Sequence, residues 1–139
     1  MANFYKGQRL THLNKWEVYI WTKWLDQHAD EYFGYTYDVH VGTPVKIPEE
    51  WPDWMKIDTD ALSSKRIDVV MEDGEAIYIV EIKENATLGC LGTILSYRYL
   101  YIETFNPTKP VHLILVTDKM DPDLLPILNS LAIRYFIVA

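Results

Sequence analysis

Two adjoining apolar segments near the middle of the chain constrain its fold more than any other feature. Arg66–Met71 and Ala76–Lys83 are both rich in Ile and Val, and the short connection between them contains Asp73-Gly74. An Asp-Gly pair between apolar runs is a strong signal for a β-hairpin. We therefore expect two antiparallel strands joined by a tight turn.

The register of this hairpin decides which side chains share a face of the sheet. A loop made only of Asp73-Gly74 places Asp68 opposite Ile79. Because side chains alternate along a strand, Asp68 and Glu81 then project from one face, diagonally across from each other. Their backbones would be roughly 7–8 Å apart. Lys83 lies one step beyond Glu81 on the same face.

This pair of acids, flanked by apolar residues, predicts a cation site. Two carboxylates on an inner face repel each other unless a proton or a cation lies between them. Mg²⁺ is commonly held by one or two carboxylates, with water and phosphate oxygens completing its shell. Lys83 could then orient or deprotonate an attacking water, or stabilise charge on a phosphate. The alternative is that both acids simply face solvent, which the neighbouring Val70 and Ile79 disfavour.

The first predicted helix extends from about Thr11 to Ala29, with apolar residues at helical spacing. Glu17 projects inside this apolar stripe and not opposite it. Two interpretations stay open. Glu17 supplies a further carboxylate to the cation site, or it completes a capping box with Asn14 if the helix begins late.

A second helix is predicted from Asn85 or Thr87 to about Glu103. Its spacing predicts a buried apolar stripe. Gly89 and Gly92 weaken such a helix, which indicates close packing or the approach of another group. The residues expected in the buried stripe are Leu88, Leu91, Leu95 and Ile102.

The remaining segments complete a single domain over residues 1–139. Strands are expected at Tyr35–Val41, Val111–Thr117 and Ile133–Val138, and a short helix is expected after Asp121. The order helix, strand, hairpin, helix, strand, helix, strand predicts an α/β or α+β fold, with helices flanking a mixed β-sheet.

The residues around the hairpin resemble the PD-(D/E)XK nuclease superfamily. The match consists of Asp68 and, thirteen residues later, Glu81-Ile82-Lys83 at the end of a strand that a helix follows. The element order is also similar to the αβββαβ core of restriction-endonuclease-like proteins, here with an extra C-terminal helix and strand. Ile67 stands in place of the proline, and Thr93 stands one turn before Tyr97, where this superfamily often has glutamine.

The resemblance implies a function and a set of roles. It implies hydrolysis of phosphodiester bonds, usually in DNA, with Mg²⁺ as the cofactor and Mn²⁺ as a substitute. Asp68 and Glu81 would bind the metal, with the Ile82 carbonyl and Glu17 as further ligands, and Lys83 would be the catalytic lysine. Candidates for phosphate contacts, each of which could instead be an ordinary solvated surface residue, are Arg66, Tyr97 and Arg98.

The connection at 43–65 is long for a compact domain and contains Trp51 and Trp54 among prolines and acids. Such connections often bind partners, and exposed aromatic residues anchor interfaces. The alternative is that both tryptophans fold back as a lid. The segment from Lys65 to Tyr101 also resembles small phage-encoded members of the superfamily, some of which complete the head and neck of tailed virions.

Composition limits the remaining options. A formal net charge of −7 disfavours a protein that neutralises many phosphates. The apolar runs are too short for a membrane span, no signal peptide is recognisable, and the single Cys90 cannot form an internal disulfide. We expect a cytoplasmic protein, in the host cell or the virion if it is phage-encoded.

Two functions from different classes remain. The first is a metal-dependent DNA endonuclease or DNA-processing enzyme. The second is a structural or adaptor protein, of a phage head–neck assembly, that keeps the nuclease fold without catalysis and binds other subunits.

Overall fold

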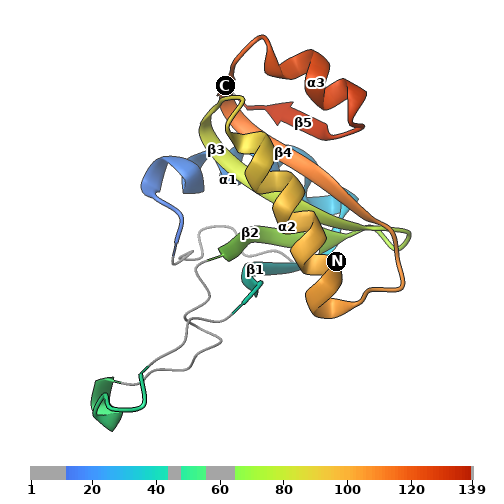
Figure 1. Cartoon of the computed structure of the whole chain (residues 1–139). Coiled ribbons are helices and arrows are strands. Elements are labelled where there is room, and N and C mark those ends of the chain that lie inside the picture. The colour runs from blue at the N-terminus through green and yellow to red at the C-terminus, as the bar shows by residue number, and fades with distance from the viewer. Residues whose placement is uncertain (1–11, 44–47, 56–64, 139) are drawn as a thin grey trace.

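A computed structural model describes residues 12–43, 48–55 and 65–138 of the chain (Figure 1). Its described part contains five strands, three α-helices and two short 3₁₀ turns, in the αβββαβ order expected from the sequence, followed by the extra helix and strand. The helices are α1 (Lys15–His28), α2 (Cys90–Phe105) and α3 (Leu124–Ser130). The strands are β1 (Phe33–Val41), β2 (Lys65–Glu72), β3 (Ile77–Ala86), β4 (Val111–Met120) and β5 (Arg134–Ile137).

The sheet is mixed, with the strands in sequence order from β1 to β5. The first three strands are antiparallel neighbours, whereas β3, β4 and β5 run parallel to one another. Parallel neighbours need a crossover connection, and α2 and α3 supply the two that this sheet requires. The α+β class predicted from the sequence is therefore confirmed.

Helices cover both faces of the sheet, which explains why the central strands are apolar on both sides. α1 packs on one face through Ile20, Trp21 and Trp24, and Trp24 has no exposed surface. α2 crosses the other face, nearer the viewer in Figure 1, and packs there through Cys90 and Ile94. No helix in the described part of the chain is long and apolar enough to cross a bilayer.

The hairpin forms, but its loop is longer than the two residues expected. Glu72 pairs with Ile77 and Val70 with Ile79, so the connection spans Asp73 to Ala76. The side chain of Asp73 accepts hydrogen bonds from the backbone N–H groups of Glu75 and Ala76, each at 3.0 Å. These local bonds stabilise a wider turn than an Asp-Gly pair alone would make. The register is shifted by two residues, which keeps every side chain on its expected face.

The second helix differs from the sequence prediction in its start and in the side that is buried. β3 continues to Ala86, and α2 begins only at Cys90. Leu88, Leu95 and Ile102 are 45, 43 and 37% exposed, so the expected buried stripe largely faces outward. The helix is apolar on more than one side, and periodicity alone cannot tell which side meets the sheet.

Smaller boundary corrections concern the caps. α1 starts at Lys15, because Asn14 caps it, and the expected start at Thr11 lies outside the described residues. Asp121 opens a turn before α3, accepting a hydrogen bond from the N–H of Asp123 at 2.9 Å, and the helix proper starts at Leu124.

Part of the predicted 43–65 connection lies outside the described residues, namely 44–47 and 56–64. Within the described part, Trp51 is 41% exposed and Trp54 is 82% exposed. These values contradict the interpretation of the two tryptophans as a buried lid.

Candidate metal and phosphate site

A polar pocket of about 340 Å³ lies where the start of α1, strands β2 and β3, and helix α2 meet. Asp68, Glu81 and Lys83 all line it, as strand alternation predicts. Val69, Val80 and Ile82 alternate with them and are buried in the core on the α1 side. The remaining lining residues are His12, Leu13, Glu17, Arg66, Thr93 and Tyr97.

The shifted hairpin register makes the two acids neighbours at the end of the paired part of the hairpin. Val69 and Val80 form the last pair between β2 and β3, and Asp68 and Glu81 are the next residues of the two strands. One oxygen of Asp68, Oδ2, accepts a hydrogen bond of 2.7 Å from the Ile82 N–H. The two carboxylates are 6 and 7% exposed, which excludes the alternative that they are ordinary solvated acids.

Glu81 lies in an environment that disfavours its negative charge. Burial, reinforced by the adjacent Asp68, raises the pKa of Glu81 to about 9, and Lys83 only partly opposes this effect. Its Oε2 atom is buried and has no hydrogen-bond partner within the described structure. A buried, unsatisfied carboxylate oxygen beside a second carboxylate fits a hard divalent cation, which prefers oxygen ligands.

Two protein carboxylates would be the principal ligands. Across residues 12–43, 48–55 and 65–138, no three His, Cys, Asp or Glu side chains are arranged to enclose a metal ion. Mg²⁺ does not need such a cage, since it retains several waters and binds substrate phosphates. The donor set therefore suits Mg²⁺ better than a structural zinc ion.

His12 is a site residue that the sequence did not reveal. Its Nε2 lies 2.6 Å from Asp68 Oδ1, and its Nδ1 lies 2.8 Å from Asp38 Oδ1 in an ion pair without good hydrogen-bond geometry. The hydrogen bond to Asp68 is the largest cause that raises the pKa of His12 above its ordinary value. His12 thus bridges two carboxylates on neighbouring strands.

Asp38 joins this cluster through the pairing of β1 with β2. Tyr37 pairs with Val69 and Val39 with Ile67, so Asp38 lies opposite Asp68. Asp38 has a φ of 59°, in the left-handed region that Asp tolerates better than most residues. Arg66 Nε lies 3.5 Å from Asp38 Oδ1. A row of three acids, Asp38, Asp68 and Glu81, therefore crosses three strands. Only the sheet register could have revealed it.

Glu17 forms the capping box with Asn14, and it also lines the pocket. Its Oε1 accepts a hydrogen bond of 3.0 Å from the Asn14 N–H, and Asn14 Oδ1 accepts one of 2.8 Å from the Glu17 N–H. The carboxylate also adds slightly to the raised pKa of Glu81. One of its oxygens is thus engaged in the helix cap.

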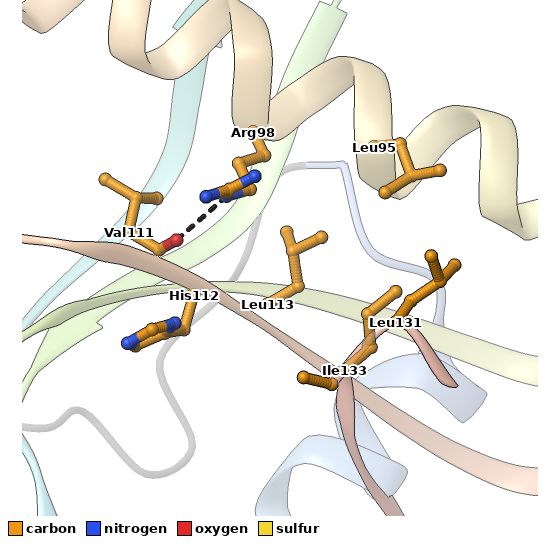
Figure 2. A pocket seen from close by; sticks show the side chains of 8 residues that line it. Leu95, Arg98, Val111, His112, Leu113, Leu131 and Ile133 are labelled. Atoms are coloured by element: carbon orange, nitrogen blue, oxygen red, sulfur yellow. Dashed lines mark hydrogen bonds between the residues drawn. The ribbon is translucent and has the colours of Figure 1, made fainter. Parts of the chain in front are cut away.

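The candidate phosphate-contacting residues separate into two places. Arg66 and Tyr97 line the pocket beside the acids, and burial raises the pKa of the Tyr97 hydroxyl. Arg98 lies instead in a different hollow, where its Nε donates a 2.9 Å hydrogen bond to the Val111 carbonyl (Figure 2). Successive residues of a helix point about 100° apart, which explains the separation of Tyr97 from Arg98.

No protein-family model matches the sequence, and no curated protein matches it either. A crystal structure of a repair endonuclease from Pyrococcus abyssi is similar to this chain, with a TM-score of 0.44 and 18% sequence identity. The similarity covers 53% of this chain and 34% of that one, so this chain spans about a third of the neighbour's length.

Proposed function

We propose that this protein is a divalent-metal-dependent phosphodiesterase that cleaves DNA. The observation that carries the proposal is the buried pair Asp68 and Glu81, which lies on two neighbouring strands and lines one pocket together with Lys83. Burying two adjacent carboxylates is costly for the fold unless a positive ligand compensates them.

The free oxygen of Glu81 and the carboxylate of Asp68 would hold Mg²⁺ or Mn²⁺, and the Ile82 carbonyl would be a further ligand. Glu17 would contribute through its oxygen that is not in the helix cap. The cation supplies Lewis-acid polarisation of the scissile phosphate.

The protein's own groups would perform the remaining tasks. Lys83 would stabilise negative charge that develops on the phosphate, or orient the attacking water. Arg66 and Tyr97 would hold a neighbouring phosphate, because both line the pocket. His12 would fix the orientation of Asp68 through the 2.6 Å contact.

We propose DNA as the substrate because the pocket combines ligands for a cation with a lysine and an arginine. These groups together can bind a single phosphodiester group. The net charge of −7 limits the protein to a small contact area on the nucleic acid. Arg98, which lies away from the pocket, would contact DNA only outside the reactive phosphate.

The test is cleavage of plasmid, linear and branched DNA with Mg²⁺, with Mn²⁺ and with EDTA. We expect cleavage that needs the divalent cation and is lost in Asp68→Asn and Lys83→Ala. The matched control is Lys109→Ala, since Lys109 pairs with Glu72 away from the pocket and its loss should leave cleavage intact. Cleavage that survives Lys83→Ala, or that is absent from the wild type with every substrate and cation, would refute the proposal.

One observation favours a second candidate, a virion-assembly or adaptor protein that keeps the site without catalysis. Trp54 is 82% exposed in the 43–65 connection, and an exposed tryptophan commonly anchors a protein interface. A wild-type protein that binds the cation but cleaves no DNA would favour this candidate over the enzyme.

A further inference from the structure

Two aromatic rings and a lysine form a column on the outer side of α1. Trp16 stacks on Tyr19, with ring centroids 5.2 Å apart and ring planes inclined by 28°. The Lys23 ammonium lies over the Tyr19 ring, 5.3 Å from its centroid. Trp16 and Tyr19 are 46 and 49% exposed, although tryptophan is highly buried on average. We call the set of Trp16, Tyr19 and Lys23 the α1 stack.

The fold fixes the orientation of these rings without burying them. Trp16 Nε1 donates a hydrogen bond of 3.3 Å to Asp118 Oδ2 near the end of β4. Side chains three or four residues apart lie one above the other on a helix, so the members of the α1 stack follow the helix axis. Neither ring belongs to the hydrophobic core on either side of the sheet. The α1 stack is therefore a pre-organised flat surface that faces solvent.

The open face of Trp16 is directed toward the polar pocket. Tyr19 covers the face of Trp16 on the C-terminal side, so the other face looks toward the start of α1. Leu13, three residues before Trp16, and Glu17, the residue after it, both line the pocket. One helical turn rises by about 5.4 Å. The α1 stack thus begins about one turn away from the pocket.

The sheet also connects the α1 stack with the pocket. Asp118, which holds the Trp16 indole, follows Thr117, and Thr117 pairs with Lys83 across β3 and β4. Lys83 lines the pocket in which we place the phosphate. Trp16 and Lys83 therefore lie toward the same end of the sheet, where β3 and β4 finish.

A ring surface beside a phosphate pocket matches the chemistry of a nucleotide. Every nucleobase has a π face, so bases stack on tryptophan and tyrosine whatever the sequence. Lys15 and Lys23 add positive charge along α1, in a chain whose net charge is −7. Within a duplex, the faces of a base are covered by its neighbours, and only an unpaired base can stack on a side chain. The ligand that fits is therefore a nucleotide with an unpaired base.

We propose that the α1 stack binds an unpaired base of the DNA strand whose phosphodiester group enters the pocket. This inference rests on the proposed function and narrows the substrate class to single-stranded DNA and the single-stranded parts of branched DNA. The base lies on the open face of Trp16. Stacking holds the strand beside the reactive phosphate without reading its sequence.

The first test is binding of a short labelled single strand, and of the duplex of the same sequence, by fluorescence anisotropy. It is done in EDTA, and also in Mg²⁺ with Lys83→Ala in every chain, so that no DNA is cut. We expect the single strand to bind at least about tenfold more tightly than the duplex. Trp16→Ala should weaken single-strand binding by about 5- to 100-fold, and Trp16→Phe should retain most of it because a ring remains. The matched control is Tyr99→Ala, at a tyrosine of α2 that is 65% exposed, and it should bind like the wild type.

A strand without bases separates stacking from a structural role of Trp16. An oligonucleotide of the same length that carries abasic sugars keeps the phosphates and loses every base. The wild type should bind it more weakly than the normal strand, and Trp16→Ala should distinguish the two strands much less. Equal discrimination by the wild type and Trp16→Ala would overturn the proposal. Circular dichroism should show that the variants are folded.

Cleavage assays distinguish failure of this inference from failure of the proposed function. Single-strand binding that depends on Trp16, in a wild type that cleaves no DNA, would support the base-binding site and refute the phosphodiesterase. Metal-dependent cleavage by a chain that binds the duplex more tightly, or whose single-strand binding is unchanged in Trp16→Ala, would overturn the inference and leave the enzyme standing.

Discussion

Asp68 on β2 and Glu81 on β3 line the same pocket, and each is less than a tenth exposed. The Asp68 carboxylate is hydrogen-bonded to His12 and to the Ile82 N–H. In contrast, Glu81 Oε2 is buried and has no hydrogen-bond partner in the described structure. The pair is therefore asymmetric, with Asp68 fixed by the protein and Glu81 available to an external cation.

Divalent cations should stabilise the folded protein through this pair. A ligand that binds only the folded state stabilises it by about 2.7 kcal/mol when its concentration is a hundredfold above its dissociation constant. Millimolar Mg²⁺ or Mn²⁺ should therefore raise the melting temperature measured by calorimetry. Asp68→Asn and Glu81→Gln should each remove this increment, whereas Glu75→Gln, in the exposed turn, should keep it. An increment that persists in both site variants would place the cation elsewhere.

The pH dependence of stability should report the ionisation of Glu81. Its folded pKa, about 9, is higher than its ordinary value of 4.5. The folded state therefore favours the protonated form, and this contribution is full below pH 4.5 and lost as the pH rises toward 9. In EDTA, Glu81→Gln should match the wild type near pH 4 and exceed it near pH 9, by roughly 1–3 kcal/mol. Urea unfolding at several pH values measures the difference in stability between the variant and the wild type. A difference that is the same near pH 4 and near pH 9 would contradict the prediction.

The contribution of His12 to stability should also be lost at high pH, as that of protonated Glu81 is. Its pKa is raised above 6.5, chiefly by the hydrogen bond to Asp68, so its contribution is full below pH 6.5 and is lost as the pH rises through the raised value. His12→Gln should cost about 1–3 kcal/mol at pH 6 and less at pH 9. The same variant should weaken Mg²⁺ binding in calorimetric titration, because Asp68 loses its orientation. His28→Gln, at an exposed pair with Glu31, is the matched control.

Replacing Trp24 should destabilise the protein much more than replacing Trp54. Trp24 is fully buried on the α1 side of the sheet and stacks on Trp21 at 4.7 Å between ring centroids. Trp24→Ala should destabilise the protein by about 3–5 kcal/mol. Trp54→Ala should change stability by less than about 0.5 kcal/mol, since Trp54 is mostly exposed. Chemical denaturation of both variants tests this, and comparable losses would show that Trp54 packs on the core.

The sequence by itself determined the order of the elements and the face of the sheet on which the acids lie. Both follow from local chemistry: apolar runs and turn residues mark the strands, and alternation with a period of two survives a register shift of two residues. For this reason Asp68, Glu81 and Lys83 share a pocket although the loop at Asp73 is longer than expected.

Only the tertiary structure decided which residues complete the site and which side of α2 is buried. His12 approaches Asp68 from a position 56 residues away along the chain, and Asp38 reaches it through the pairing of β1 with β2. Such contacts depend on register and helix placement, which no local pattern encodes. α2 is apolar on more than one side, so the sheet buries Cys90 and Ile94 and leaves Leu95 and Tyr99 outside. The choice between those sides is made by packing over the whole sheet and not by the helix itself.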